Sequence, residues 1–347
     1  MLPGMKGVFS DAIAVDLGTV NTLVYVVGRG IIIDEPSTVA VSTRAGEREL
    51  IAVGDEARRI IGLTPEPLEA LRPMRDGVIA DFVATEFMLR QFIRRARSMV
   101  NFRRPQILIS VPAGATPVEK RAVTETARHA GAGTVRLIAE PVAALLGAGV
   151  AVEEAEGAMV VDIGGGTTDI AIVSCGKPVI SRSLRCAGNA MDDAIIRYVR
   201  RRHQLVIGEA NAERIKIEAG TAAARANGVD VDVHIRGREL RRGRFKSIVL
   251  GPRHIAEALD DPISAIAEFV QRAIEDVPAT IAADISERGI TLTGGGALLE
   301  RLDQELSRRL GIICALAEDP VRCVIKGAAM VVERLSASDH LLIAVDR

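Results

Sequence analysis

Two segments of this chain repeat one pattern. Residues 13–19 read IAVDLGT and residues 160–167 read VVDIGGGT. In each, an apolar run ends in Asp, one apolar residue and Gly, and Thr follows within a few positions. Short apolar runs that end in glycine turns are typical of buried strands entering a hairpin. The repeat therefore predicts two similar lobes, each of which offers a phosphate-binding turn to a shared cleft.

Length and composition agree with two lobes. A chain of 347 residues is longer than one typical domain, and an apolar content of 48% is ample for two cores. Aromatic residues make up only 3% and Trp is absent, so we expect these cores to be aliphatic. The net charge of −1 gives no sign of a nucleic-acid partner.

The cysteines and histidines argue against several other classes. The four cysteines form no CxxC pair and no secretory segment precedes them, so we expect reduced thiols in a cytosolic protein. The five histidines lack ligand spacing, which disfavours a transition-metal site. No apolar run reaches the roughly 18–20 residues that span a bilayer.

Strand-like runs and helical stretches alternate in the same order twice. We predict a meander of strands within 13–41, an irregular excursion over 42–75, a long helix over 82–100, and strands and helices in alternation over 106–147. A second meander lies within 158–184, followed by helices over 190–203 and 210–220 and a strand-like stretch over 229–250. Three helical stretches over 253–288, a strand over 290–293 and helices over 297–310 and 321–335 complete the chain. This succession predicts an α/β protein with two related halves.

The first glycine turn has the chemistry of a phosphate loop. Gly18 permits a tight turn whose backbone N–H groups face an anion, and Thr19 and Asn21 add short side-chain donors. Asp16, at the strand end, can hold a hydrated Mg²⁺. The alternative reading is an ordinary β-turn closed by an Asx-type hydrogen bond.

The second glycine turn gives a stronger signal. Three consecutive glycines, Gly164, Gly165 and Gly166, suit close approach of the backbone to a ligand, and Asp162 again stands at the strand end. A flexible hairpin turn is the alternative. A third cluster at 294–296 lies between a predicted strand and helix, where it can pack against a base or ribose or bind an anion. Neither a Rossmann fingerprint nor a Walker A motif is present.

Three charged residues are further candidates. Glu140, before Pro141 at a strand-to-helix junction, could orient a water for attack on a γ-phosphate; the alternative is a helix N-cap. Glu213 and Lys216, three apart on one helix face, could reach ribose hydroxyls or the adenine edge. Their alternative is an exposed ion pair.

Five motifs together resemble a known family. DLGTVNT, IAEPVAALLGAG, DIGGGTTD, ERIKIEAG and LTGGGALLERL, in this order, resemble the actin/Hsp70/sugar-kinase ATPase superfamily and, within it, the MreB/Mbl family of bacterial actin homologues, the rod-shape determining proteins. Stretches 71–82, 187–200 and 318–333 support the resemblance, which extends from about residue 11 to 333.

The resemblance implies the architecture. It predicts an α/β actin-like ATPase fold in which two related lobes, duplicated ribonuclease H-like domains, surround a nucleotide cleft and comprise four subdomains. The implied boundaries are 1–39, 74–154 and 328–347 for subdomain IA, 40–73 for IB, 155–189 and 255–327 for IIA, and 190–254 for IIB.

The resemblance also implies the site and its cofactors, ATP and Mg²⁺. Asp16 and Asp162 would hold Mg²⁺ through waters, Glu140 would orient the hydrolytic water, and Thr167 would complete the catalytic set. The implied nucleotide-binding residues are Gly18, Thr19, Val20, Asn21, Gly164, Gly165, Gly166, Thr167, Glu213, Arg214, Ile215, Lys216, Gly294, Gly295, Gly296, Ala297 and Leu298. The chain departs from the family at Val20, Ala139 and Leu145, where Ala, an acidic residue and Ala are more usual.

Function follows from the resemblance as an expectation. It implies slow ATP hydrolysis that times assembly, self-association into paired filaments, and guidance of the cell-wall elongation machinery from the cytoplasm, at the inner face of the membrane. Met99, Val100 and Phe102, among several arginines, are the predicted membrane contact, because an apolar tip in a basic ring suits an anionic bilayer surface. The alternative is a helix end packed into the core.

Two other classes share the superfamily. A chaperone ATPase of the Hsp70 type needs a substrate-binding domain after the ATPase, and we find no such segment. A sugar or acetate kinase needs an acceptor pocket, for which we find no motif. A basic cluster over 236–246 reads as a solvated turn, or as a contact for phosphate headgroups or a neighbouring subunit.

Overall fold

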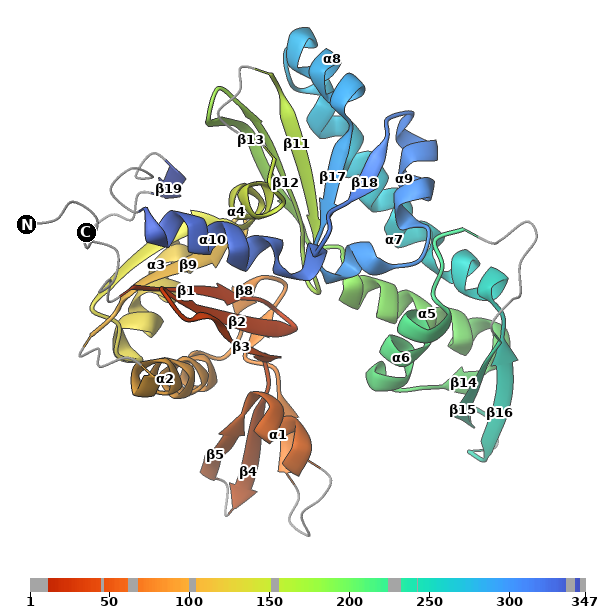
Figure 1. Ribbon diagram of the computed structural model, residues 1–347. Helices are drawn as coiled ribbons and strands as arrows, with labels where there is room; N and C mark the ends of the chain where they lie inside the picture. The colour runs from red at the N-terminus through yellow and green to blue at the C-terminus, as the bar shows by residue number, and fades with distance from the viewer. Residues whose placement is uncertain are drawn as a thin grey trace, which may run out of the picture.

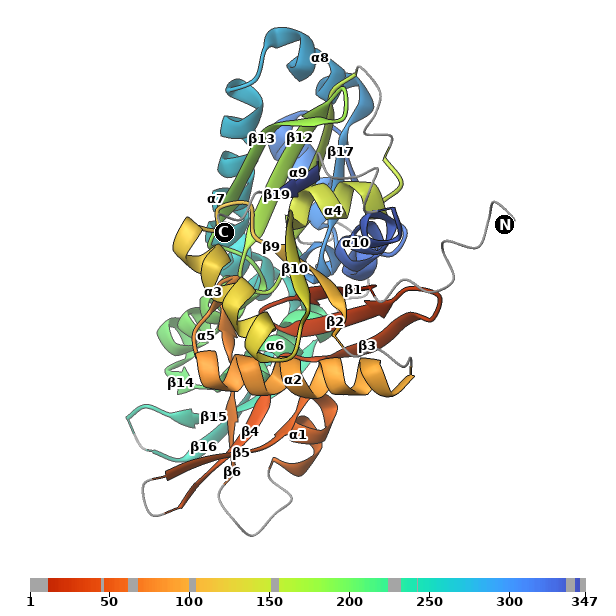
Figure 2. The ribbon, with the colours of Figure 1, turned by 90° about the vertical axis from the view of Figure 1, so that its left-hand side faces the viewer.

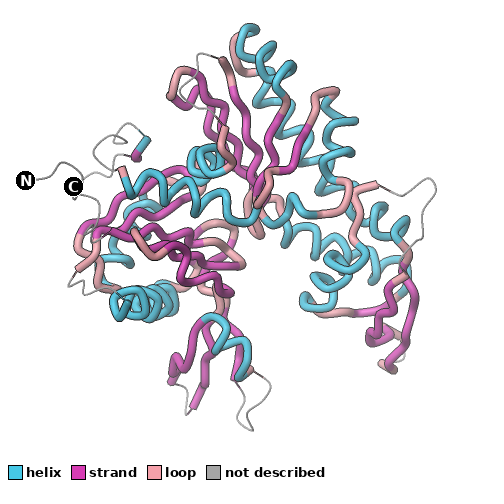
Figure 3. The backbone as a smooth tube through the Cα atoms, viewed as in Figure 1, coloured by secondary structure: helices cyan, strands magenta, loops and turns pink. Residues whose placement is uncertain are grey.

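The protein has two lobes, each built on one large β-sheet (Figure 1). The computed structural model describes residues 12–44, 47–61, 68–99, 104–150, 156–223, 232–241, 243–334 and 341–343. Lobe I carries the early strands and helices α2 and α3, and lobe II carries the later strands and helices α5 to α9. Figure 3 shows the strands of the two sheets gathered on either side of two central helices.

The sheet of lobe I has the order β19-β10-β9-β1-β2-β3. Strands β1 to β3 form an antiparallel meander, and β9 and β10 join β1 in parallel. Helices α2 and α3 cover one face and bury a cluster that includes Phe92 and Ile109. The bounds are β1 (Ala12–Leu17), β2 (Asn21–Val26), β3 (Gly30–Pro36), α2 (Phe82–Met99), β9 (Gln106–Val111), α3 (Pro117–His129), β10 (Thr134–Ala139) and β19 (Leu342–Ile343).

The sheet of lobe II repeats this topology, with the order β13-β12-β11-β17-β18. Strands β11 to β13 form an antiparallel meander, and β17 and β18 continue from β11 in parallel. The shared order confirms the duplicated α/β architecture. The bounds are β11 (Ala158–Ile163), β12 (Thr168–Ser174), β13 (Lys177–Leu184), α7 (Pro252–Glu275), α8 (Ala279–Arg288), β17 (Ile290–Thr293), α9 (Leu302–Leu310) and β18 (Cys314–Leu316).

Two helices, α4 (Glu140–Gly147) and α10 (Cys323–Glu333), cross between the sheets. They bury one apolar cluster with residues of both lobes, among them Leu108 and Val160. The crossing is close enough to require glycine. A Cβ on Gly147 would lie 1.8 Å from the carbonyl oxygen of Cys323, and one on Gly327 would lie 1.8 Å from that of Ala143. Backbone contact therefore joins the lobes at this point.

Each lobe carries a small outlying sheet (Figure 2). The described residues of the stretch predicted as an irregular excursion instead form short strands and a helix, packed around Ala40, Ala52 and Ala57. These small side chains let the helix lie flat on the short sheet. It comprises β4 (Val39–Arg44), β5 (Glu47–Val53), α1 (Gly54–Ile60) and β6 (Leu68–Leu71), and a short hairpin follows, β7 (Met74–Arg75) and β8 (Val78–Ile79). Lobe II carries α5 (Gly188–His203), β14 (Leu205–Val206), α6 (Glu209–Ala219), β15 (Val233–Glu239) and β16 (Phe245–Leu250).

Two helix predictions were wrong. The stretch 253–288 holds two helices rather than three, because α7 continues through the buried Pro262. Its apolar side chains keep helical spacing on both sides of the proline, and their burial outweighs the lost hydrogen bond. The stretch 297–310 is broken: a 3-10 turn, η1 (Gly295–Leu298), precedes α9, and Arg301 between them has a left-handed φ of 64°. A second 3-10 turn, η2 (Pro320–Arg322), precedes α10.

Across the residues that the structure describes, no helix combines the length and the apolar character needed to cross a bilayer.

Candidate functional site

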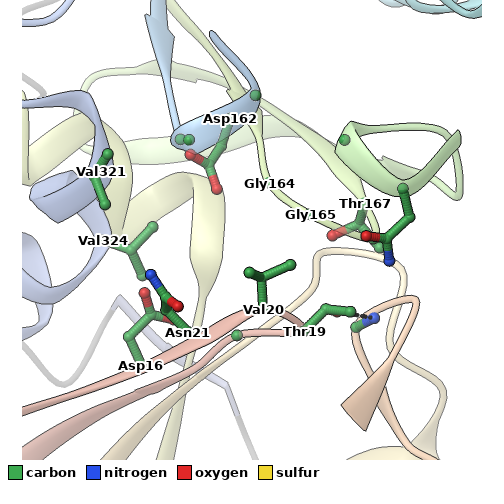
Figure 4. Close-up of a pocket in the computed structure, with 18 of the residues that line it drawn as sticks. Asp16, Thr19, Val20, Asn21, Asp162, Gly164, Gly165, Thr167, Val321 and Val324 are labelled. Atoms are coloured by element: carbon green, nitrogen blue, oxygen red, sulfur yellow. Dashed lines mark hydrogen bonds between the residues drawn. The ribbon is translucent and has the colours of Figure 1, made fainter. Parts of the chain in front are cut away.

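A cleft of about 240 Å³ opens between the lobes where β1 and β11 end. Both glycine turns face it, as Figure 4 shows. The predicted site residues that line it are Asp16, Gly18, Thr19, Val20, Asn21, Glu140, Asp162, Gly164, Gly165, Gly166, Thr167, Glu213, Lys216, Gly294, Gly295 and Gly296. Segments far apart in the sequence thus converge on one cavity.

The two strand-end aspartates occupy equivalent positions. Asp16 ends β1 beside Ser110 of the parallel strand β9, whose hydroxyl donates to Asp16 Oδ1 at 2.8 Å. Asp162 ends β11 beside Thr293 of the parallel strand β17, whose hydroxyl donates to Asp162 Oδ1 at 2.7 Å. Each carboxyl is therefore oriented by one hydroxyl from a neighbouring strand. They enter the cleft from opposite lobes (Figure 4).

The two glycine turns contact each other across the cleft. A Cβ on Gly165 would lie 2.2 Å from Cγ2 of Val20, and one on Gly166 would lie 2.8 Å from Oγ1 of Thr19. Thr19 Oγ1 also accepts a hydrogen bond of 3.0 Å from the N–H of Gly77, in the turn between β7 and β8. Only residues without a side chain fit these places, so the glycines allow two backbones to approach one ligand.

Helices of lobe II form the side wall. The N–H groups of Gly188 and Asn189, at the start of α5, donate to the carbonyls of Gly164 and Gly165 at 3.1 and 2.7 Å. Lys216 Nζ, on α6, donates to Asp192 Oδ2 at 2.9 Å and to the Gly188 carbonyl at 3.0 Å. The Glu213–Lys216 helix is thereby fixed to the second glycine turn.

Several buried acidic groups with raised pKa values lie together in the cleft. Burial raises the pKa of Asp16 to about 6 and that of Asp162 to about 7. The hydrogen bonds that Ser110 donates to Asp16 and Thr293 donates to Asp162 oppose the rise. The pKa of Glu140, which begins α4 and is only 9% exposed, lies well above its usual value because of burial and the charges of Asp169, Asp16 and Asp162. Such a group of acids favours a bound cation.

The donor set fits a hydrated magnesium ion rather than a directly caged metal. Across the described residues, no group of three or more His, Cys, Asp or Glu side chains is arranged to hold a metal. Two carboxylates lining one cleft suit Mg²⁺, which usually keeps several waters and binds one or two carboxylates together with phosphate oxygens of a ligand. Asp16 and Asp162 are the residues that would hold it.

Four predicted nucleotide contacts do not line the cleft. Ile215 and Ala297 are buried in the core of lobe II. Arg214 points away and pairs with Glu218 at 2.6 Å, and Leu298 is 55% exposed. The helix expected after Gly296 is only a 3-10 turn, so it provides no helix N-terminus for an anion. The predicted membrane contact lies outside the described residues, since Val100, Phe102 and the side chain of Met99 are not described.

The cleft also contains residues that no prediction named. Gly188, Asn189 and Asp192 belong to the AGNAMDD stretch, which supported the resemblance but was given no role. The glycine and the acidic residues of this stretch, at the start of a predicted helix, could have marked it as part of the site. The apolar lining residues could not be predicted in this way, because single aliphatic residues form no recognisable motif. The further lining residues are Leu23, Gly77, Gly188, Asn189, Asp192, Ile217, Val321 and Val324.

Two lobes of one strand order, with matched aspartates and glycine turns closing on a shared cleft, define an actin-like α/β protein. The family model described as MreB/Mbl protein matches residues 10–340. The chain therefore belongs to the MreB/Mbl family.

Similar proteins agree with this assignment. The chain is 48% identical over 339 residues to the "Cell shape-determining protein MreB" of Escherichia coli (strain K12), covering 96% of this chain and 97% of that protein. It is 41% identical over 327 residues to the "Cell shape-determining protein Mbl" of Bacillus subtilis (strain 168), covering 94% and 97%.

Solved structures agree as well. The crystal structure of MreB5 of Spiroplasma citri bound to ADP superposes with a TM-score of 0.86 at 34% identity, covering 94% of this chain and 97% of that one. The MamK double helical filament, at 21% identity and a TM-score of 0.75, shares the fold. The expected actin-like fold is thus confirmed.

Proposed function

We propose that this chain is an actin-like cytoskeletal protein that binds and slowly hydrolyses ATP and polymerises into membrane-associated filaments. These filaments would determine rod cell shape by guiding cell-wall synthesis. The observation that carries the proposal is the pair of glycine turns meeting above Asp16, Asp162 and Glu140 in a member of the MreB/Mbl family. The similar Spiroplasma citri protein was solved with ADP and with AMPPNP, which supports a nucleotide in this cleft.

Each set of residues has a distinct task in this proposal. Backbone N–H groups around Gly18 and Gly165 would bind the phosphates, and Glu213 and Lys216 the nucleoside. Asp16 and Asp162 would hold Mg²⁺, which neutralises phosphate charge when bound. Glu140, fixed at the start of α4, would orient the attacking water through its carboxylate.

Two family departures bear on the rate. Val20 fills the space in front of Gly165, so the contact between the turns is tighter than Ala would make it. Ala139 removes a charge next to Glu140. Both changes leave the phosphate turns intact, so we expect them to affect hydrolysis more than binding.

Self-association and the membrane belong to the same proposal. Filaments of paired strands, attached to the inner face of the membrane through Met99, Val100 and Phe102, would place the chain in the cytoplasm beside the cell-wall machinery. The cell shape-determining names of the relatives from Escherichia coli and Bacillus subtilis support this role. The four-subdomain division is also proposed, supported by a small sheet outlying each large one.

Sedimentation tests the proposal directly. At tens of micromolar with Mg–ATP and anionic vesicles, we expect the protein to pellet, and to pellet less without nucleotide. Phe102→Ser should reduce pelleting with vesicles while leaving pelleting without lipid unchanged. A protein that stays in the supernatant under all these conditions is not a filament former. The chaperone and kinase alternatives are not favoured, because family and fold agree with the cytoskeletal class.

A further inference from the structure

The duplicated lobes differ at one position beside the cleft. On β11, Asp162 lies opposite Asp169 of β12. On the equivalent strand of lobe I, Asp16 lies opposite Leu23 of β2. Leu23 is 2% exposed and Asp169 is 0% exposed. The fold therefore accommodates an apolar side chain at this position. The sheet itself does not require an acid there, so Asp169 in lobe II needs another explanation.

Burying an acid directly opposite another acid opposes folding. Like charges facing each other across two strands are destabilising, and a buried carboxyl with an unmade hydrogen bond adds to the cost. Asp169 has both disadvantages, because Oδ2 is buried without a hydrogen-bond partner in the described structure. It also lines none of the cavity, so it does not touch a ligand there. Asp169 can therefore influence the cleft only through its neighbours.

The neighbours of Asp169 come from both lobes. Its Oδ1 accepts a hydrogen bond of 2.8 Å from the backbone N–H of Ala113, in the lobe I loop that follows β9. Burial raises the pKa of this carboxyl, and the Ala113 N–H and the nearby hydroxyls of Thr167 and Ser183 oppose the rise. Ser183 lies opposite Asp169 on β13. One carboxyl thus contacts the second glycine turn and the opposite lobe.

The loop over 112–116 is held against lobe II at further points. A Cβ on Gly114 would lie 3.0 Å from Cβ of Ser183. A Cβ on Gly77 would lie 2.5 Å from Cγ of Pro112 and 3.1 Å from Cγ2 of Thr167, so the Thr167 side chain is enclosed by lobe I as well. The loop then enters α3 through the capping box of Thr116 and Glu119. The position of Thr167 is therefore set where the lobes meet.

We propose that Asp169 is a positioning residue, a latch that fixes Thr167 and the second glycine turn against the 112–116 loop of lobe I. The catalytic arrangement then forms only when the lobes are closed. This inference rests on the proposed ATPase function and assigns that function a further residue. ATP would still bind in the cleft without the latch, but hydrolysis requires it.

Two variants test the latch: Asp169→Asn, which keeps the shape without the charge, and Asp169→Leu, which copies lobe I. In the nucleotide-free protein, we expect amide hydrogen exchange at Ala113 to accelerate about tenfold in Asp169→Leu and less in Asp169→Asn, since a charge-assisted acceptor is removed or weakened. With Mg–ATP, kcat for phosphate release should fall about tenfold or more in both, while the Kd for ATP stays within about threefold.

Asp284→Asn is the matched control, because Asp284 Oδ2 likewise accepts a backbone N–H, that of Gly157 at 2.8 Å, but lies within lobe II away from the cleft. It should leave kcat and Ala113 exchange unchanged. Unchanged exchange at Ala113 in both Asp169 variants overturns the proposal, and so does an unchanged kcat. A parallel loss of ATP affinity and kcat also overturns it, because general unfolding produces that result. If the wild-type protein binds ATP without hydrolysing it, the proposed ATPase activity and the catalytic role of the latch are both refuted. Exchange at Ala113 reports only on the hydrogen bond between Ala113 and Asp169, so it distinguishes the two failures.

Discussion

Four carboxyl groups, those of Asp16, Glu140, Asp162 and Asp169, gather near the two glycine turns. All four have raised pKa values, with burial as the largest cause. For Asp162, a shift from 3.8 to about 7 corresponds to a cost on the order of 4 kcal/mol for ionising it in the empty cleft. A cation held by Asp16 and Asp162 would offset part of this cost.

A pH dependence of binding follows for Asp16 and Asp162. Because their pKa values in the ligand-free protein are about 6 and about 7, binding of Mg–ATP to the ionised forms should release protons. We expect the affinity to rise by about tenfold or more from pH 5.5 to pH 7.5. Calorimetry in buffers of different ionisation enthalpy measures the released protons. Asp162→Asn should flatten the slope, and an equally steep slope in that variant would contradict the assignment.

The same groups set the sign of the stability change. The ordinary aspartate pKa of 3.8, which applies to the unfolded chain, lies below the folded values, so the unfolded state loses its protons first as the pH rises. The contribution of these two groups to the stability of the ligand-free protein therefore falls between about pH 4 and pH 7. Urea midpoints with and without Mg–ATP across this range separate this effect from ligand binding.

Glu140 gives a second prediction at the residue scale. Glu140→Ala should retain ATP binding but lower phosphate release by about a hundredfold, since a positioned acid–base group contributes on that order. Glu140→Gln, which keeps the shape, should also be slow, because the amide cannot act as an ionised acceptor. Release at the wild-type rate in either variant, measured with a phosphate sensor, refutes the role assigned to this carboxyl.

Among the elements, the crossing of α4 and α10 decides how the lobes are joined. Gly327→Ala should lower the free energy of unfolding by about 2 kcal/mol or more, because the added methyl has no room beside the Ala143 carbonyl. Gly208→Ala is the control. No atom lies within 4 Å of its added methyl, so its cost, that of a poorer helix N-cap, should stay below about 1 kcal/mol. Equal urea midpoints for the two variants would show that the crossing tolerates a side chain.

Elements also show where sequence reasoning succeeds and fails. Helix α2 was predicted over 82–100 and spans Phe82–Met99, because its apolar residues recur at helical spacing over five turns. The break expected within α7 is absent, since tertiary burial of Ile255, Ile266 and Val270 outweighs the local effect of Pro262. Local signals therefore located long amphipathic elements, while helix ends and breaks depended on packing.

For the whole molecule, we expect the apolar cluster around α4 and α10 to make the lobes unfold as one cooperative unit. The chain has two tyrosines, Tyr25 in lobe I and Tyr198 in lobe II. In the Tyr198→Phe variant, the fluorescence of the remaining Tyr25 thus reports the unfolding of lobe I. In the Tyr25→Phe variant, the fluorescence of Tyr198 reports the unfolding of lobe II. We expect the two variants to unfold at the same urea concentration after correction for each substitution's own effect.

Ligand binding extends this prediction. Mg–ATP at about 100 times its Kd should raise the free energy of unfolding reported by both tyrosines by about 2.7 kcal/mol, because in the proposed function the nucleotide would contact both lobes. Two separate unfolding transitions, of which ATP shifts only one, would show that only one lobe binds the nucleotide. The two single-tyrosine variants serve as controls for each other, since each retains the complete cleft.

The sequence by itself singled out Asp16, Asp162, Glu140 and the glycine turns as candidates, and all of them line the cleft. The duplicated order of strands was also readable, since alternating apolar runs and helices depend on local pattern. Tertiary structure alone decided the rest. Asp169 lies two residues past the second turn and its role is invisible without Ala113, which is 56 positions away. Likewise Arg214 and Ile215 belong to a motif of the cleft but face away from it, because which helix face meets a cavity depends on what the other faces pack against.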